Sequence, residues 1–219
     1  MGKVIYCISG LGADEKVFNN LELNGHDLRH IPWLRPNKKE TIEGYASRMR
    51  QQINEPAILL GVSFGGMIGI EIAKQIQLEK LIIVSSIKNV KELPAWMRYV
   101  GQFQLNKFLP TRSYKFTEKI DNDRIGVSND EELKMVQAYR RSADPFYLEW
   151  AINEVLNWKN EWLPQNIIHI HGERDKIFPI KKLKADHVIK DGTHLMIYNR
   201  GKEISELIRK ELGCYSESF

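Results

Sequence analysis

Short apolar runs recur along the chain, separated by stretches in which apolar residues repeat with a helical period. The runs are rich in β-branched residues and continuously apolar, which is typical of strands in a parallel sheet covered on both faces. The three clearest runs end at glycine or serine. Together with three weaker ones, they predict strands at residues 4–8, 28–33, 57–60, 81–84, 167–170 and 187–189.

Amphipathic segments lie between these runs. Residues 42–53 place their apolar side chains on one helical face, whereas residues 67–76 are apolar almost all round and predict a central, buried helix. Residues 204–212 repeat the amphipathic pattern, and Gly213 follows as a stop signal. The alternation of strands and helices indicates right-handed crossovers and an open α/β sheet.

The alternation breaks once, between residues 87 and 147, where no convincing strand occurs. Three prolines punctuate this stretch, and Asn129 or Asp130 could cap a helix within it. It is too long for an ordinary loop of a compact domain. We therefore expect one domain over residues 1–219, with residues 87–147 forming a small helical insertion at one end of the sheet.

Composition narrows the possible partners. The 32 basic and 28 acidic residues are scattered along the 219-residue chain, which is typical of a solvated surface rather than of a nucleic-acid interface. Cys7 and Cys214 form neither a disulfide framework nor a zinc-ligand spacing. No apolar stretch has the length needed to span a bilayer. The expectation is a cytoplasmic protein without nucleic-acid or membrane partners and without a metal or cofactor.

The sequence GVSFGG over residues 61–66 joins a predicted strand to the buried helix. A serine on so sharp a turn is held in a strained conformation with its hydroxyl exposed, beside the positive end of the helix dipole. Side chains at Gly61 or Gly65 would collide across the turn. The alternative is a serine that merely caps the helix. We interpret Ser63 as a nucleophile.

A nucleophilic serine needs a base, and the chain offers six histidines. His194, in DGTH, lies between the last predicted strand and the final helix, where it can reach the top of the sheet, and is the predicted base. His169 and His171 flank Ile170 on a predicted strand, so a structural role is expected for both.

A carboxylate should hold the imidazole in its useful tautomer. Asp175, in HGERDKIFP, follows a predicted strand and is the preferred candidate. Glu173 and Asp191 are competitors, although Glu173 suits a surface role and Asp191 precedes Gly192 in an apparent turn. For the oxyanion, the backbone N–H groups of Leu11 and Phe64 are the predicted donors, each contributing about 2.7–4 kcal/mol in comparable sites.

The three segments GVSFGG, HGERDKIFP and DGTH occur in the order Ser, Asp, His, and in this the chain resembles the α/β-hydrolase superfamily. The resemblance covers nearly the whole chain. It implies an open, mostly parallel sheet of about six strands with helices on both faces and residues 87–147 as the cap. It also implies a serine hydrolase of the carboxylesterase or thioesterase type, acting on a small-molecule ester or thioester through an acyl-enzyme without a cofactor. An acyl group bound to a carrier is a further candidate substrate.

Three departures from the family pattern affect this interpretation. Ser9-Gly10 replaces the usual His-Gly of the oxyanion loop, which alters the loop's side-chain support. The chain begins at what resembles the family's third strand. Residues 85–88, which follow Val84, contain no carboxylate, and this removes the family's alternative acid position and favours Asp175.

Other functions compete with this hypothesis. Lactone or carbon–carbon bond hydrolysis could use the same triad, and a catalytically silent binding protein could share the fold. Residues 10–15 resemble a dinucleotide fingerprint, but the third glycine is missing and two acidic residues would face the pyrophosphate. Four aromatic residues in or beside the insertion are predicted either to line an acyl pocket or to form the insertion's own core: Trp96, Phe103, Phe146 and Trp150.

Overall fold

A parallel sheet forms the centre of the protein. The computed structural model describes residues 2–54, 56–104 and 114–213. Its six strands are ordered β2-β1-β3-β4-β5-β6, and every neighbouring pair is parallel. The predicted open α/β sheet is confirmed. The strands are β1 (Val4–Ile8), β2 (Asp27–His30), β3 (Ala57–Val62), β4 (Leu78–Val84), β5 (Ile167–Gly172) and β6 (His187–Ile189).

The second strand is shorter than its apolar pattern predicts. β2 ends at His30, although the expected strand extends to residue 33. The N–H of Ile31 still donates to the carbonyl of Cys7 at 2.9 Å, and this is the last bond of the ladder in the described part of the chain. The chain therefore leaves the sheet at Pro32 and carries Trp33 toward the loop that follows β1.

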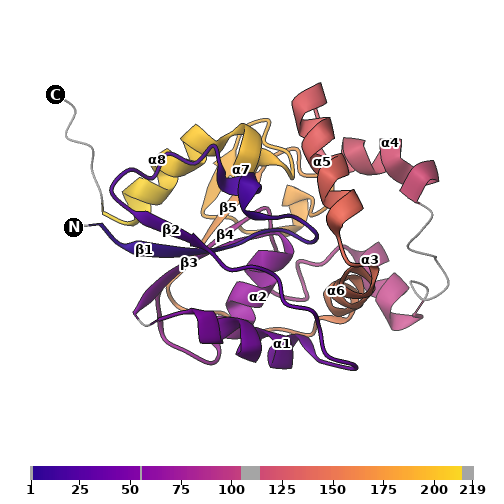
Figure 1. The fold of residues 1–219 in the computed structure, drawn as a ribbon, viewed down its shortest axis with the longest axis horizontal. Helices are drawn as coiled ribbons and strands as arrows, with labels where there is room; N and C mark the ends of the chain where they lie inside the picture. The colour runs from indigo at the N-terminus through magenta and orange to yellow at the C-terminus, as the bar shows by residue number, and fades with distance from the viewer. Residues whose placement is uncertain (1, 55, 105–113, 214–219) are drawn as a thin grey trace.

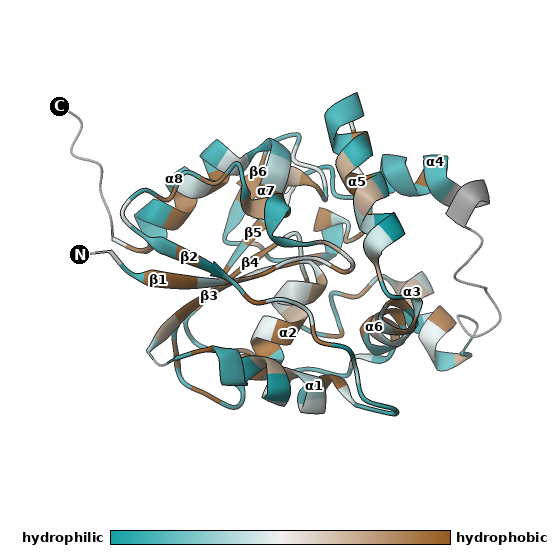
Figure 2. Cartoon of the chain, in the orientation of Figure 1, coloured by the Kyte–Doolittle hydropathy of each residue, from teal (hydrophilic) through white to brown (hydrophobic). Residues whose placement is uncertain are grey.

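Helices cover both faces of the sheet (Figure 1). On one face lie α1 (Ile42–Met49) and α2 (Phe64–Ala73), and on the other lie α7 (Met196–Asn199) and α8 (Gly201–Glu211). The all-round apolar character of α2 follows from its position, because it is buried from Phe64 to Ile72. Figure 2 shows the same pattern, with hydrophobic residues along β1 and β3 and mixed faces on α8. Within the described ranges, no helix combines the length and apolarity needed to cross a bilayer.

Between β4 and β5 the described residues contain helices and no strand. The helices are α3 (Ala95–Gln102), α4 (Tyr114–Ile125), α5 (Asp130–Ser142) and α6 (Pro145–Asn157), and they lie beyond the carboxyl ends of the strands (Figure 1). Asn129 caps α5 by accepting from the N–H of Glu132. The helical stretch continues past residue 147, because Asp144 and Pro145 start a helix there. Residues 105–113 and Cys214 lie outside the described residues.

Short 3-10 helices lie in several of the connecting loops. They include η1 (Glu15–Phe18), η2 (Arg50–Gln52) and η5 (Ile180–Lys182). The first of these begins where the alternative dinucleotide-binding interpretation of residues 10–15 would place a phosphate. There Asp14 caps η1 by accepting from the N–H of Lys16 at 3.0 Å, and Glu15 lies 3.8 Å from the imidazole of His30. Asp14 thus has its partner within the loop, whereas Glu15 faces the end of β2.

Candidate active site

Ser63 occupies a strained turn between β3 and α2. Its backbone has φ 53° and ψ −119°, a conformation that residues other than glycine rarely adopt. The end of β4 anchors it: the N–H of Ser63 donates to the carbonyl of Val84 at 2.9 Å, and its carbonyl accepts from the hydroxyl of Ser86, just beyond that strand, at 2.7 Å. The carbonyl also accepts from the N–H of Gly66 at 3.0 Å. These bonds hold the serine at the N-terminus of α2.

The glycines of this turn are required by close backbone contacts. A Cβ atom at Gly61 would lie 2.5 Å from the carbonyl oxygen of Gly65, so the expected collision across the turn does occur there. A Cβ atom at Gly65 would instead lie 2.4 Å from the carbonyl oxygens of Ile8 and Ser9. The end of β1, which a sequence pattern cannot place beside the turn, therefore imposes the glycine at position 65.

His194 lies between Ser63 and Asp175. Its Nε2 is 2.9 Å from the Ser63 hydroxyl, and its Nδ1 is 2.8 Å from Oδ2 of Asp175. Because a carboxylate only accepts, Nδ1 carries the proton of the neutral ring and Nε2 is left to accept from the hydroxyl. The structure therefore brings together the three side chains that the sequence singles out, in the order that general-base chemistry needs.

Asp175 is buried and fully engaged. Its Oδ1 accepts from the N–H groups of Ile177 and Phe178 at 2.8 and 2.9 Å, which leaves Oδ2 to His194. Burial on its own would raise the pKa of Asp175. The adjacent His194, the hydrogen bond it donates and the remaining contacts outweigh burial and lower that pKa below its ordinary value. The carboxylate is thus held in its charged form.

The two competing carboxylates have other partners. Asp191 lies 2.6 Å from the guanidinium of Arg174, and the side chain of Glu173 accepts from the N–H of Asp191 at 3.2 Å. Asp191 has φ 58°, consistent with the turn expected before Gly192. Of the three candidate acids, Asp175 is the one that pairs with His194 within the part of the chain that the structure describes.

The loop after β1 lies against Ser63. A Cβ atom at Gly10 would lie 3.6 Å from Cβ of Ser63, so this part of the loop packs against the serine. Phe64 is the first residue of α2, so its N–H is one of the helix-initial donors without a partner inside the helix. Phe64 directly follows Ser63 and Leu11 directly follows Gly10, and the role of their N–H groups as oxyanion donors remains a prediction.

Ser9 and Trp33 join the loop after β1 to the segment that follows β2. The Ser9 hydroxyl donates to the carbonyl of Ala13 at 2.7 Å and accepts from Nε1 of Trp33 at 3.0 Å. The Trp33 ring stacks on Phe64 at a centroid distance of 5.5 Å. Trp33 thus contacts both predicted oxyanion segments. Sequence reasoning missed Trp33, because no local pattern signals its contacts with Ser9 and Phe64.

Helix α4 contacts the loops that carry the acid and the base. Lys176, next to Asp175, forms an ion pair with Asp123 at 2.7 Å. Gly126, with φ 88°, packs so closely on Thr193 that a Cβ atom there would lie 2.2 Å from the Thr193 Cβ. The N–H of Leu195 donates to the carbonyl of Ile125 at 3.1 Å. The insertion is therefore fixed to the residues on both sides of His194.

The four predicted pocket aromatics occupy different environments. Trp96 on α3 and Phe103 directly after that helix are 53% and 62% exposed, and Phe146 lies under the guanidinium of Arg35. Trp150 is buried in the main core, with its ring 4.4 Å from Tyr45 and 6.0 Å from Phe64. Trp150 therefore has the environment expected of a core residue, and none of the four is shown to contact a substrate.

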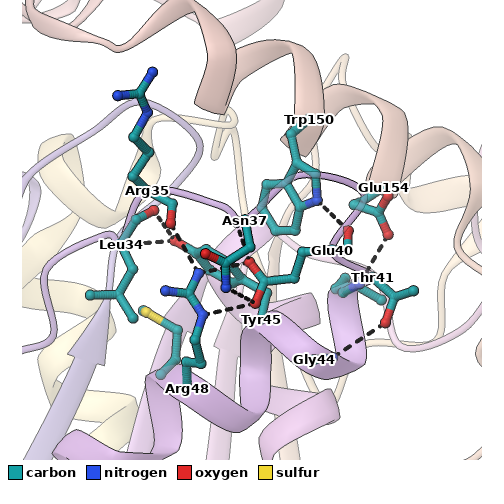
Figure 3. Close-up of polar contacts among 12 residues, drawn as sticks. Leu34, Arg35, Asn37, Glu40, Thr41, Gly44, Tyr45, Arg48, Trp150 and Glu154 are labelled. Carbon is teal, nitrogen blue, oxygen red and sulfur yellow. Dashed lines mark hydrogen bonds and ion pairs between the residues drawn. The ribbon is translucent and has the colours of Figure 1, made fainter.

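Trp150 also joins α6 to the loop before α1. Figure 3 shows Trp150 and Glu154 directed from α6 toward this loop. The indole N–H of Trp150 donates to the carbonyl of Glu40 at 2.7 Å, and the Glu154 carboxylate accepts from the N–H of Ile42 at 3.0 Å. The Glu40 carboxylate in turn pairs with Arg48 at 2.7 Å. The polar and aromatic contacts between α6 and the loop before α1 consequently lie beside Phe64.

Nothing in the described ranges suggests a metal centre, since no group of three or more His, Cys, Asp or Glu side chains is arranged to hold an ion. No protein-family model matches the chain, and a search of curated proteins finds no similar sequence.

Solved structures of hydrolases share the fold. An esterase from Thermogutta terrifontis superposes with a TM-score of 0.77 at 17% identity, covering 97% of this chain and 90% of that one. An epoxide hydrolase from Bacillus megaterium gives 0.66 at 14% identity, covering 97% and 94%. An N-acyl homoserine lactonase complexed with N-hexanoyl homoserine gives 0.64 at 18% identity, covering 100% and 91%. At these identities the likeness concerns architecture, and it agrees with the sheet order and helices described above: the chain has the α/β-hydrolase fold.

Proposed function

We propose that the protein is a serine hydrolase that cleaves a small carboxylic ester or thioester through an acyl-enzyme. The observation that carries this proposal is the continuous line of hydrogen bonds from the Ser63 hydroxyl through His194 to Asp175, at 2.9 and 2.8 Å. The strained backbone of Ser63 at the start of α2 supports it, because such a turn exposes the hydroxyl beside helix-initial N–H groups.

Each residue has a defined role in the proposed reaction. His194 Nε2 takes the hydroxyl proton while Ser63 Oγ bonds to the carbonyl carbon, whose π electrons move to the carbonyl oxygen. The N–H groups of Leu11 and Phe64 stabilise that oxyanion. When the intermediate collapses, the leaving alcohol or thiol takes the proton from His194. Water then attacks the acyl-enzyme by the same route, releasing the carboxylic acid and regenerating Ser63.

Helices α3 to α6, in and just beyond residues 87–147, are assigned the role of a cap over this site. Their position beyond the carboxyl ends of the strands supports the assignment, because ligands of open α/β sheets bind at that edge. In this proposal, the exposed Trp96 and Phe103 and the partly exposed Phe146 are candidates for acyl contacts, whereas Trp150 supports Phe64 from the core side.

Reaction with a fluorophosphonate probe, which modifies activated serines, tests the mechanism. Wild-type protein should become labelled at Ser63, and Ser63→Ala should abolish labelling and lower kcat by about 10⁴- to 10⁶-fold. A set of p-nitrophenyl esters, acyl thioesters and lactones then identifies the bond cleaved. Undiminished turnover by Ser63→Ala would contradict the proposal, and a preference for lactones would replace its substrate class.

A further inference from the structure

The hydrogen-bonded line does not end at Asp175. Behind the acid, on β5, two histidines are completely buried: His171 and His169. Nε2 of His171 lies 2.8 Å from the carbonyl oxygen of Phe178 and 3.5 Å from Oδ2 of Asp175. Nδ1 of His171 lies 3.1 Å from Nε2 of His169.

The protons in this pair can be assigned from the chemistry of the partners. A carbonyl oxygen only accepts, so Nε2 of His171 carries a proton and donates it to Phe178. Burial is the main cause that lowers the pKa of His171, which favours the neutral ring. Nδ1 of that neutral ring is then an acceptor, and it receives the Nε2 proton of His169. His171 therefore donates its Nε2 proton to Phe178, in the loop that carries Asp175, and accepts from His169.

This donor acts on the segment that carries the acid. Asp175 folds back on its own loop through the N–H groups of Ile177 and Phe178, while the carbonyl of Phe178 is tied to the sheet by His171. The Phe178 ring also packs against the imidazole of His194 at 5.7 Å. One buried donor thus fixes both the carboxylate and the ring beside the base.

We propose that His171 is a positioning residue, which holds the Asp175 loop and thereby the imidazole of His194 in register with Ser63. This inference rests on the proposed function, since it assigns the acid role to Asp175. Misplacement of a reacting group by about 1 Å can cost on the order of 10²-fold in rate. Loss of the His171 donor should therefore appear in kcat, with KM changed little.

Two polar substitutions separate positioning from simple folding. His171→Gln can place an amide N–H near the former Nε2, whereas His171→Asn is too short to reach Phe178 but can still bond to His169. We expect kcat toward p-nitrophenyl acetate, and the rate of fluorophosphonate labelling, to fall about 10²-fold in His171→Asn. Both quantities should stay within about fivefold of wild type in His171→Gln. His187→Gln, on the adjacent β6, is the matched control and should behave as wild type.

The decisive comparison repeats the Asn and Gln variants in an Asp175→Asn background. If His171 acts through the carboxylate, the rate difference between the two variants should shrink to about twofold there. A difference that persists at full size, or equal rates of the two variants in the wild-type background, would overturn the inference. Failure of the proposed function looks different, because Ser63→Ala would then keep its activity whatever occupies position 171.

Discussion

The hydroxyl of Ser86 donates a hydrogen bond to the carbonyl of Ser63, at 2.7 Å. Ser86 follows β4, so this bond joins the neighbouring strand to the residue with the strained backbone. The contact is tight, because a Cβ atom at Gly66 would lie 2.5 Å from the same hydroxyl. The strained backbone of Ser63 is thus held in place by the Ser86 hydroxyl as well as by the helix that follows.

Ser86→Ala should consequently loosen the turn. We expect a loss of about 1 kcal/mol in the free energy of unfolding and about a tenfold lower kcat, measured by urea denaturation and ester hydrolysis. Ser85→Ala is the matched control, because the buried Ser85 hydroxyl has no hydrogen-bond partner in the described part of the chain. Equal effects of the two substitutions would show that the bond to Ser63 contributes nothing specific.

The identity of the acid can be tested by three substitutions. Asp175→Asn should lower kcat by about 10⁴-fold without unfolding the protein, because the amide favours the wrong imidazole tautomer. Glu173→Gln and Asp191→Asn should have small effects. The Glu173 side chain accepts from the N–H of Asp191, and the Asp191 side chain pairs with Arg174 instead of His194. Steady-state kinetics under identical conditions separates the assignments, and a larger loss at Glu173 or Asp191 than at Asp175 would disprove ours.

Gly126 offers a test of how the insertion affects the base. Gly126→Ala should lose about 1–2 kcal/mol of stability from its positive φ, and its Cβ would also displace Thr193, the neighbour of His194. We expect kcat to fall about 10²-fold. Gly25→Ala is the control: φ is 85° there and no atom lies within 4 Å of the added Cβ. Gly25→Ala should show the stability loss with unchanged kcat. An unchanged kcat in Gly126→Ala would refute the proposed effect of the Gly126–Thr193 contact on His194.

The buried histidines make stability depend on pH. Burial, reinforced by His171, lowers the pKa of His169 from 6.5 to about 2. The unfolded chain therefore binds a proton below pH 6.5 that the folded chain excludes, so stability falls as the pH drops from 6.5 toward 2. At pH 5.5 the cost is about 1.4 kcal/mol for this group.

Urea denaturation at pH 7.5 and pH 5.5 measures this contribution. Between the two pH values, His169→Leu should lose about 1.4 kcal/mol less stability than wild type. Ile170→Val, a non-titrating change in the same strand, should lower stability by the same amount at both pH values. A wild-type pH dependence that survives in His169→Leu would mean that another group is responsible.

Sequence patterns predict the parts of this site that depend on local order. Ser63, Asp175 and His194 each follow a strand, and parallel strands end at one edge, so their convergence can be expected before any coordinates. Their catalytic roles remain predictions. Trp33 cannot be found from the pattern because its partners, Ser9 and Phe64, meet it only once β2 has paired with β1. For His171 the sequence predicts no more than a structural role, since its relation to Phe178 depends on how the loop folds back.

The four pocket aromatics show a second limit of pattern reading. Trp150 and Trp96 both lie on helices near the site, and composition alone does not distinguish them. Their burial differs because α6 docks on the loop before α1 through Glu40 and Ile42, whereas the Trp96 side of α3 remains open. Such docking depends on contacts between residues about 110 positions apart, which no local periodicity encodes.

The attachment of α4 to the loops that carry Asp175 and His194 limits how this scaffold could be re-engineered. A cap exchanged as a whole would remove Asp123 and Gly126, the two residues that back Lys176 and Thr193. Grafting a new specificity should therefore replace α3 and α5 while retaining the end of α4. The natural unit of exchange in this protein is smaller than the proposed cap, because the end of α4 already supports the loops that carry Asp175 and His194.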